Sequence, residues 1–183
     1  RIINNYLAAM TEVIKKHKGT IDEFIGDAIL AIFGAPVGRE DDARRAIACA
    51  IEMQLAMHAV NEYNRKNDLP EIEMGIALHT GEVIVGNIGS EQRAKYGVVG
   101  TAVNLTSRIE TYTIGGQILI SDATAERVRE ALSAAGLTLR DLGENRLKDI
   151  ATPQRLYQIV IPELASDFPP LRTQATRGSV NSA

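Results

Sequence analysis

The sequence predicts an α+β fold, in which helices alternate with strand hairpins along one chain. Two patterns lead to this prediction. Several segments carry apolar residues at helical spacing, and short apolar runs joined by glycine-containing turns have the length of strands. The chain has 183 residues, of which 45% are hydrophobic, and this is enough for one domain with a real core. The interleaved order favours a sheet with its helices on one face.

The first elements are a helix and a hairpin. Gly19 follows the helix and can end it. A hairpin over residues 20–33 comes next, because two apolar runs flank the pair Gly26-Asp27, and glycine adopts turn conformations that other residues avoid. The first helix is predicted from apolar or amphipathic residues at helical spacing: Ile3, Tyr6, Leu7, Met10, Val13, Ile14 and His17.

A second helix follows, capped by Asp41 or Asp42 and ended by a polar loop over residues 64–70. Its predicted inward face consists of Ala43, Ile47, Ala50, Ile51, Leu55 and His58. The remaining elements are predicted as strands at 72–79, 82–88 and 96–99, a helix at 100–113, a strand at 117–120, a helix from 121 or 122 to about 134, and strands at 137–142 and 155–160. From Pro162 onward, proline, serine, glycine and asparagine predict a flexible tail over 162–183, which leaves 1–161 as the folded domain.

Composition and charge exclude several classes of protein. The net charge of −3 provides no overall basic surface for nucleic acid. The single cysteine, Cys49, rules out an internal disulfide and is expected to be a core residue. No apolar run has the length of a membrane span, so no membrane contact is expected from this segment. These features favour a domain in the cytoplasm or on the cytoplasmic face of a membrane.

One carboxylate and one pair of side chains are the first candidates for chemistry. Asp27 lies at the predicted hairpin tip, where a carboxylate can bind Mg²⁺, although aspartate is also common in turns for backbone reasons. Asn104 and Arg108 are four residues apart and therefore share one face of a helix. An amide and a guanidinium together suit a sugar oxygen and a phosphate, and two solvated surface residues are the alternative.

Two further basic residues are weaker candidates. Arg93 lies in a loop that combines glycines with cations and can hold an anion, or can simply be solvated. Arg155 lies on the last predicted strand, where a basic residue at a sheet edge commonly serves solvation. The chain contains no glycine-rich phosphate loop, dinucleotide fingerprint, zinc spacing or serine nucleophile elbow.

In this order, the motifs resemble those of the class III nucleotide cyclase catalytic domain, over residues 1 to about 161. Bacterial members, including cyanobacterial ones, are the most similar in style. The resemblance is carried by Phe24-Ile25-Gly26-Asp27-Ala28, Gly34-Ala35-Pro36, Gly75-Ile76-Ala77-Leu78-His79-Thr80-Gly81-Glu82-Val83, Gly86-Asn87-Ile88-Gly89-Ser90, Val99-Gly100-Thr101-Ala102-Val103-Asn104-Leu105-Thr106-Ser107-Arg108, Leu147-Lys148-Asp149-Ile150 and Tyr157.

The resemblance implies a ferredoxin-like antiparallel sheet with added hairpins, and a head-to-tail homodimer whose active sites lie at the interface. The implied reaction is attack of the ribose 3′-oxygen on the α-phosphorus, with loss of pyrophosphate, assisted by two Mg²⁺ or Mn²⁺ ions per site. Asp27 matches the second of the family's two metal-binding aspartates. The first belongs to a strand upstream of the first helix. We expect that N-terminal strand to be missing from this chain, so that the chain as written binds metals poorly and turns over little.

The resemblance also assigns roles to the candidate side chains. Asn104 matches the residue that orients the ribose, and Arg108 matches the residue that binds the α-phosphate in the transition state. Arg155 matches the position of a triphosphate-binding lysine, and Arg93 is a further phosphate candidate. These assignments are what membership of the family implies.

Glu23 and Gly97 match the two positions that select the base. Members that make cyclic AMP usually carry lysine at the first and aspartate or threonine at the second. A carboxylate at the first position accepts the two donors of guanine, N1–H and the N2 amine, and opposes the N1 lone pair of adenine. Glu23 with Gly97 is similar to the pairing in a cyanobacterial guanylate-making member. The sequence therefore favours GTP as substrate.

Three alternative functions are considered beside the guanylate cyclase. An adenylate cyclase with atypical base recognition would turn over ATP faster than GTP. A non-catalytic nucleotide-binding dimerisation module would lack an upstream aspartate in the family motif, although retention of Asp27, Asn104 and Arg108 argues against it. A diguanylate-synthesising domain is disfavoured, because no Gly-Gly-(Asp/Glu)-Glu-Phe turn is present.

Overall fold

The computed structural model describes residues 2–88 and 95–175. Within them the chain forms four α-helices of at least two turns and nine strands, and the predicted α+β class is confirmed. The chain divides into two compact units. The first contains residues 1–73 and 82–100, and the second contains residues 74–81 and 101–183.

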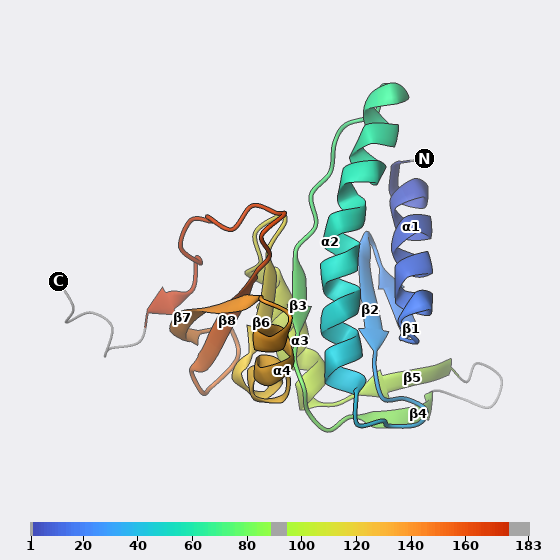
Figure 1. Ribbon diagram of the computed structural model, residues 1–183. Coiled ribbons are helices and arrows are strands. Elements are labelled where there is room, and N and C mark those ends of the chain that lie inside the picture. The colour runs from blue at the N-terminus through green and yellow to red at the C-terminus, as the bar shows by residue number, and fades with distance from the viewer. Residues whose placement is uncertain (1, 89–94, 176–183) are drawn as a thin grey trace. The chain divides into compact units, whose positions relative to one another are not determined.

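The first unit is built from two long helices and two hairpins (Figure 1). Helix α1 (Ile2–Lys16) packs against α2 (Asp42–Lys66), and strand β1 (Thr20–Ile25) pairs with β2 (Ala28–Ile32) beside α1. The second hairpin joins β4 (Ile84–Ile88) to β5 (Lys95–Val99) in antiparallel register. Apolar side chains of α1 and α2 are buried in this unit: Tyr6, Met10, Val13, Ile14, Ile47, Cys49, Ala50, Met53, Met57 and Val60.

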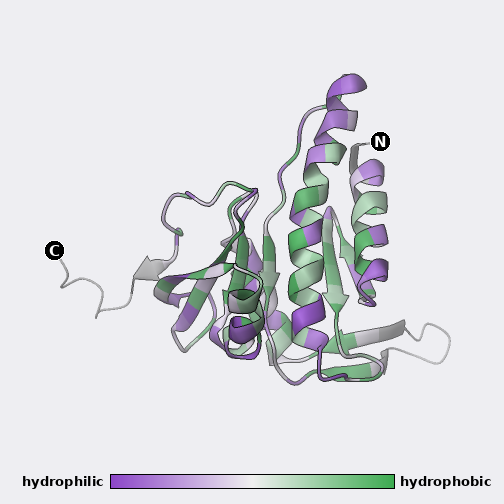
Figure 2. Cartoon of the chain, viewed as in Figure 1, coloured by the Kyte–Doolittle hydropathy of each residue, from purple (hydrophilic) through white to green (hydrophobic). Residues whose placement is uncertain are grey.

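Helix α2 differs from its prediction in two ways. It continues through residues 64–66, which were expected to be loop, because no glycine or proline interrupts it before Asn67. Its buried face is also rotated from the predicted one, since Leu55 is 41% exposed and His58 is exposed. The buried positions repeat along a neighbouring stripe that includes Met53, Met57 and Val60. Figure 2 shows a helix that is hydrophobic in its middle and hydrophilic at both ends, a pattern that leaves the apolar face ambiguous from sequence.

The second unit is built on a five-stranded sheet in the order β3-β6-β8-β7-β9. Its strands are β3 (Ile76–Leu78), β6 (Ile118–Ser121), β7 (Thr138–Arg146), β8 (Gln154–Val160) and β9 (Gln174–Ala175). Strand β3 pairs with β6 in parallel, and the other neighbours are antiparallel. The sheet is therefore mixed, whereas a purely antiparallel sheet was expected.

The helices α3 (Thr101–Thr111) and α4 (Asp122–Ala134) pack against opposite faces of this sheet. Leu156 of β8 lies in a buried cluster with Ile109 of α3, and the hydroxyl of its neighbour Tyr157 donates a hydrogen bond to Asp122 of α4. Consecutive residues of a strand point to opposite faces. The expectation of helices on one face therefore does not hold in this unit, because the order of elements alone does not fix the face that each helix covers.

The ends of several strands differ from the predicted ranges. Strand β3 is shorter than the predicted run over 72–79, and β7 continues beyond residue 142 to Arg146 through an irregularity in its pairing with β8. Residues 162–175, expected to be part of a flexible tail, lie along the sheet. Leu171 packs against its buried cluster, and β9 pairs with β7. Two apolar side chains, Phe168 and Leu171, supply contacts that the proline-rich composition obscured.

Candidate active site

The hairpin of β1 and β2 presents Asp27 at its tip. Ile25 pairs with Ala28, so Gly26 and Asp27 form the two-residue turn that the sequence predicted. Gly26 has a φ of +62°, a conformation that glycine adopts without a steric penalty. Asp27 is exposed, and its carboxylate is therefore available to a ligand.

Glu23 lies on the same hairpin, on strand β1, and is also exposed. The register shifts between Ile21 and Glu23, so one extra residue bulges from β1 just before the carboxylate. Strand β1 contacts β5, where Gly97 is buried and pairs with Gly86. The two base-selecting candidates, Glu23 and Gly97, thus lie on contacting strands of the first unit.

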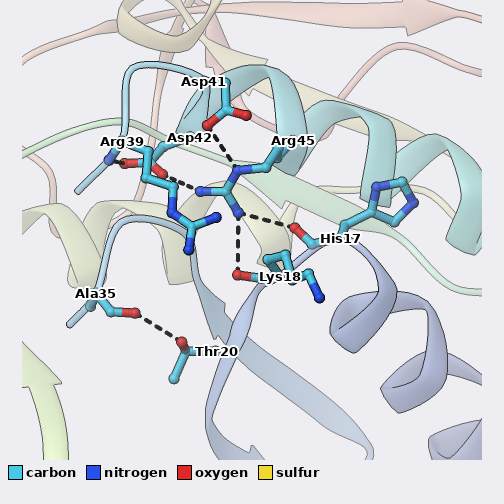
Figure 3. Close-up of polar contacts among 8 residues, drawn as sticks. All are labelled: His17, Lys18, Thr20, Ala35, Arg39, Asp41, Asp42 and Arg45. Carbon is cyan, nitrogen blue, oxygen red and sulfur yellow. Dashed lines mark hydrogen bonds and ion pairs between the residues drawn. The ribbon is translucent and has the colours of Figure 1, made fainter. Parts of the chain in front are cut away.

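Arg45 of α2 anchors the base of this hairpin (Figure 3). Its Nη1 donates to the carbonyl oxygens of His17 at 3.0 Å and Lys18 at 3.2 Å, which follow the end of α1. Its Nε donates to Asp41 at 3.0 Å, and its Nη2 donates to Asp42. These bonds join the segment between α1 and β1 to the start of α2.

Two further contacts complete this anchor. The Arg45 guanidinium lies over the ring of Phe33, which follows β2, at 5.6 Å from the ring centroid. Thr20 donates from its hydroxyl to the carbonyl oxygen of Ala35 at 2.9 Å. Hydrogen bonding from Arg45 holds the pKa of the Asp41 carboxyl below its ordinary value. Both ends of the hairpin that carries Glu23 and Asp27 are therefore held in place.

In the second unit, Asn104 and Arg108 lie on α3, as predicted. Asn104 is exposed, and its side chain has no hydrogen-bond partner within the described ranges 2–88 and 95–175. Arg108 donates from Nη2 to Oδ2 of Asp149 at 2.6 Å, and its side chain is 36% exposed. The sequence did not point to Asp149 as a partner, because the contact joins residues 41 positions apart.

Asp149 belongs to a turn, residues 147–150, that packs on α3. Leu147 is buried in the cluster that contains Ile109, and Ile150 packs against that cluster. The backbone N–H of Lys148 donates to the hydroxyl of Tyr112 at 3.2 Å. The Leu147-Lys148-Asp149-Ile150 motif was noted in the sequence, but only the tertiary structure shows that it contacts the helix of Arg108.

Of the two remaining phosphate candidates, the structure describes only Arg155. Arg155 donates to Asp141 of β7 at 2.6 Å and lies on β8, which is an interior strand and not the expected edge. It lies two residues before Tyr157 and therefore shares the face of the sheet that α4 covers, opposite α3. The structure does not bring Arg155 together with Asn104 and Arg108. Arg93 lies outside the described residues.

A polar cluster near the start of α4 contains the half-buried His79. Its Nδ1 lies 2.7 Å from Oγ of Ser121, the residue that caps α4. The hydroxyls of Thr80 and Thr124 lie 2.9 Å apart. Burial lowers the pKa of His79, which favours the neutral imidazole. Burial also raises the pKa of the Cys49 thiol to about 12, so Cys49 is a core residue, as predicted, and no nucleophile.

The donor set fits a divalent cation in part. Asp27 provides the hard oxygen that Mg²⁺ prefers. In the part of the chain that the structure describes, no three histidine, cysteine, aspartate or glutamate side chains gather into a metal-binding group. Magnesium sites with one or two carboxylates take further oxygen ligands from water and substrate phosphates, and Asp27 fits that kind of site. No described helix is long and apolar enough to cross a bilayer.

Comparison with solved structures finds both guanylyl and adenylyl cyclases. The guanylyl cyclase Cya2 is 49% identical, with a TM-score of 0.78, over 86% of this chain and 78% of that one. The adenylyl cyclase CyaB from P. aeruginosa is 33% identical, with a TM-score of 0.79, over 87% of this chain and 81% of that one. Both similarities extend over most of the described structure.

Among curated proteins, an adenylate cyclase of Anabaena cylindrica is 40% identical over 70% of this chain and 26% of its own length. Adenylate cyclase 1 of Rhizobium meliloti is 30% identical over 87% of this chain. The chain spans about a quarter of these relatives, since it covers 24% and 26% of their lengths. The family model of the adenylate and guanylate cyclase catalytic domain matches residues 1–160. The chain therefore belongs to the adenylate and guanylate cyclase catalytic domain family, the class III nucleotide cyclases.

Proposed function

We propose that this domain is a guanylate cyclase, which converts GTP to cyclic GMP and pyrophosphate. The observation that carries the proposal is the exposed carboxylate of Glu23 on β1, at the family's base-selecting position and on a strand that contacts β5 with Gly97. A carboxylate accepts both N1–H and the N2 amine of guanine. With adenine, the lone pairs of the carboxylate would face the lone pair of N1. This mismatch disfavours ATP by roughly 1–3 kcal/mol.

Gly86, which pairs with Gly97, is partly buried but has open space beside it. A Cβ atom placed on Gly86 would meet no atom within 4 Å. Gly86 and Gly97 face each other on β4 and β5, and neither carries a side chain that could obstruct a planar purine. Backbone N–H and carbonyl groups are the groups that remain there to read the rest of the base.

We propose a separate role for each of the candidate side chains. Asn104 would orient the ribose, and Arg108 would neutralise the charge that develops on the α-phosphate during attack by the 3′-oxygen. Asp27 would hold a divalent cation, which supplies charge neutralisation at the attacking and leaving oxygens when bound. Arg93 and Arg155 remain predicted phosphate contacts. A substrate phosphate bound by Arg155 would lie on the opposite face of the sheet from one bound by Arg108.

A head-to-tail homodimer forms part of this proposal. Large apolar side chains remain exposed on the strands of the first unit, among them Phe24 and Ile25 on β1, Ile84 on β4 and Val99 on β5. Exposed apolar side chains on adjacent hairpins are typical of a surface that binds a partner. In such a dimer, Glu23 and Asp27 of one hairpin would serve different active sites. The domain would act in the cytoplasm or on the cytoplasmic face of a membrane.

The second candidate function is an adenylate cyclase with atypical base recognition. The similarity to adenylate cyclases of Anabaena cylindrica and Rhizobium meliloti and to CyaB favours it. The higher identity to Cya2, 49% against 33% for CyaB, supports the guanylate assignment.

Charge reversal at Glu23 tests the proposal. In the full-length protein with Mn²⁺, Glu23→Lys should lower kcat/KM for GTP by about 10-fold or more and leave that for ATP unchanged or raised, because the lysine donates where guanine also donates. Glu12→Lys is the matched control, since Glu12 is an exposed glutamate of α1 in the same unit. Equal losses for GTP and ATP would show that Glu23 is a structural residue of the hairpin and would reject the base-reading role.

A further inference from the structure

We infer that Asp149 is a positioning residue for the nucleotide cyclase reaction, which fixes the Arg108 guanidinium where the α-phosphate reacts. This inference rests on the proposed function, since it takes Arg108 as the group that binds the phosphate. It adds a residue that the sequence motifs did not single out for any role. Three observations support it: the ion pair itself, the rigidity of the turn that carries Asp149, and the backbone conformation at Asp149.

The ion pair uses part of the guanidinium and leaves the rest available. Nη2 of Arg108 donates to Oδ2 of Asp149 at 2.6 Å, and within residues 2–88 and 95–175 this carboxylate is the one hydrogen-bond partner of the guanidinium. A guanidinium has five N–H donors in a fixed plane. Asp149 therefore restrains the plane from one edge, and the remaining donors can bind an anion.

The turn that holds Asp149 is itself held firmly against α3. Leu147 is 4% exposed and packs in the cluster with Ile109, one residue after Arg108. The N–H of Lys148 donates to Tyr112, four residues after Arg108. On the side toward β7, the hydroxyl of Thr173 donates to the side chain of Asn145 at 2.5 Å, just before the turn. A carboxylate on this turn consequently has a defined position relative to the helix.

The backbone conformation shows that the turn does not need the Asp149 side chain. Asp149 has a φ of +64°, in the left-handed region that favours glycine. Glycine would form the same turn with less strain, so the structural requirement at this position is satisfied without a carboxylate. The feature that aspartate adds here is the bond to Arg108. An exposed ion pair of this kind contributes little to stability, so its effect should appear in positioning.

The opposite interpretation is that Asp149 competes with the nucleotide for Arg108. In that case its removal would strengthen binding, and KM would fall while kcat stayed the same or rose. Positioning predicts a different result. A guanidinium that loses its restraint binds the substrate about equally well, but it is no longer positioned to stabilise the transition state. We therefore expect kcat to fall and KM to change little.

The test compares Asp149→Gly and Asp149→Asn in the full-length protein, with GTP and Mn²⁺. We expect Asp149→Gly to lower kcat about 10-fold with KM within 2-fold of the original, and Asp149→Asn to lower it less, because an amide oxygen still accepts from the guanidinium. The matched control is Asp68→Gly, because Asp68 is exposed and has a φ of +54°. It makes the same chemical change at a left-handed turn remote in sequence from α3, and should leave kcat unchanged.

A double substitution separates positioning from other effects. If Asp149 acts through Arg108, then Asp149→Gly should have no further effect on kcat in a protein that already carries Arg108→Ala. Additive losses, an unchanged kcat in Asp149→Gly, or a fall in KM alone would each overturn the inference.

A second readout does not depend on turnover. The nitrogen-15 NMR signal of the Arg108 Nε–H group should show restricted rotation in the original protein and in Asp68→Gly, and free rotation in Asp149→Gly. An unchanged Arg108 signal in Asp149→Gly would overturn the inference. If the original protein made no cyclic nucleotide from GTP or ATP, the proposed function would fail, and a positioning role in that reaction would fail with it. The NMR signal would then show whether the restraint itself exists.

Discussion

Arg45 and Arg108 are both helical arginines that bind carboxylates, yet they lie in very different surroundings. Arg45, in the first unit, is 15% exposed and donates to two carboxylates and two carbonyl oxygens while it covers an aromatic ring. Arg108, in the second unit, is 36% exposed and donates to one carboxylate. Arg45 therefore makes four hydrogen bonds within its own unit, whereas Arg108 makes one within the described residues.

We propose that this difference separates a structural arginine, Arg45, from one that binds substrate, Arg108. A guanidinium such as that of Arg45, with four of its five donors bonded within the fold, stabilises the fold and has little left for a ligand. A guanidinium held by one edge has a defined position and still has N–H donors that can bind a ligand. In the proposed function, the first unit anchors the hairpin of Glu23 and Asp27, and the second presents Arg108 from α3. Substitutions can test the contrast directly.

Arg108→Ala should have the largest effect, and that effect should be on catalysis. Loss of a preorganised donor to transition-state charge lowers kcat by about 100- to 1,000-fold. Because the Arg108–Asp149 pair is exposed, the free energy of unfolding should change by less than about 0.5 kcal/mol. Steady-state kinetics and urea denaturation of the same preparation measure both. A large loss of stability in Arg108→Ala would show that Arg108, like Arg45, is a structural residue, and would contradict this prediction.

Arg45→Ala should have its effect on stability. It removes hydrogen bonds to the carbonyl oxygens of His17 and Lys18 and leaves the half-buried carboxylate of Asp42 without its cation. We expect the free energy of unfolding to fall by about 2–3 kcal/mol, measured by urea denaturation. Arg45→Lys should recover less than half of this loss, since an ammonium does not reproduce the planar fork. A loss below about 0.5 kcal/mol would show that the network is incidental.

Gly34→Ala tests the same network through its neighbouring loop. Gly34 has a φ of +114°, which is unfavourable for any residue with a side chain, and a Cβ atom there would lie 2.7 Å from Oδ2 of Asp42. We expect a loss of about 2 kcal/mol in thermal or urea denaturation. Gly86→Ala is the control for the loss of a glycine, because a Cβ at Gly86 meets nothing within 4 Å. Equal effects of the two substitutions would mean that contact with Asp42 is unimportant.

His79 in the second unit should make stability depend on pH, by a smaller amount. Burial lowers the pKa of His79 in the folded state, so the unfolded chain takes up the proton first. The contribution of His79 to the free energy of unfolding is therefore complete above its unfolded pKa of about 6.5 and is lost as the pH falls below that value. The free energy should fall by less than about 1.4 kcal/mol per pH unit.

The measurement compares the unfolding free energies of the original protein and of His79→Asn between pH 7.5 and 5.5. The difference between the two proteins removes the contributions of His17 and His58. If that difference stayed constant over this range, the burial of a neutral His79 would be contradicted.

Much of the first unit was predictable because its signals are local. The hairpin with Gly26-Asp27 at its tip follows from two short apolar runs around a glycine, and the register confirms it. The buried stripe of α2 was predicted wrongly, since the helix has apolar residues on several sides and burial of Met53 or Met57 rather than Leu55 depends on what packs against them. Periodicity alone does not contain that information.

The second unit shows what sequence could not provide. Its strands and helices were placed approximately, but the parallel pairing of β3 with β6 and the opposite faces of α3 and α4 arise from long-range packing. The same is true of the Arg108–Asp149 bond and of the contacts made by Leu171. The identities of Asn104 and Arg108 as candidates came from the sequence, and their surroundings came from the fold.

The central claim is that Glu23 makes this cyclase domain select GTP. The most direct test measures kcat/KM for GTP and for ATP with the full-length protein and Mn²⁺, under identical conditions. We predict that GTP is preferred by about 10-fold or more, as expected when the Glu23 carboxylate meets two donors in guanine and a lone pair in adenine. A higher kcat/KM for ATP would contradict the claim and favour the adenylate cyclase.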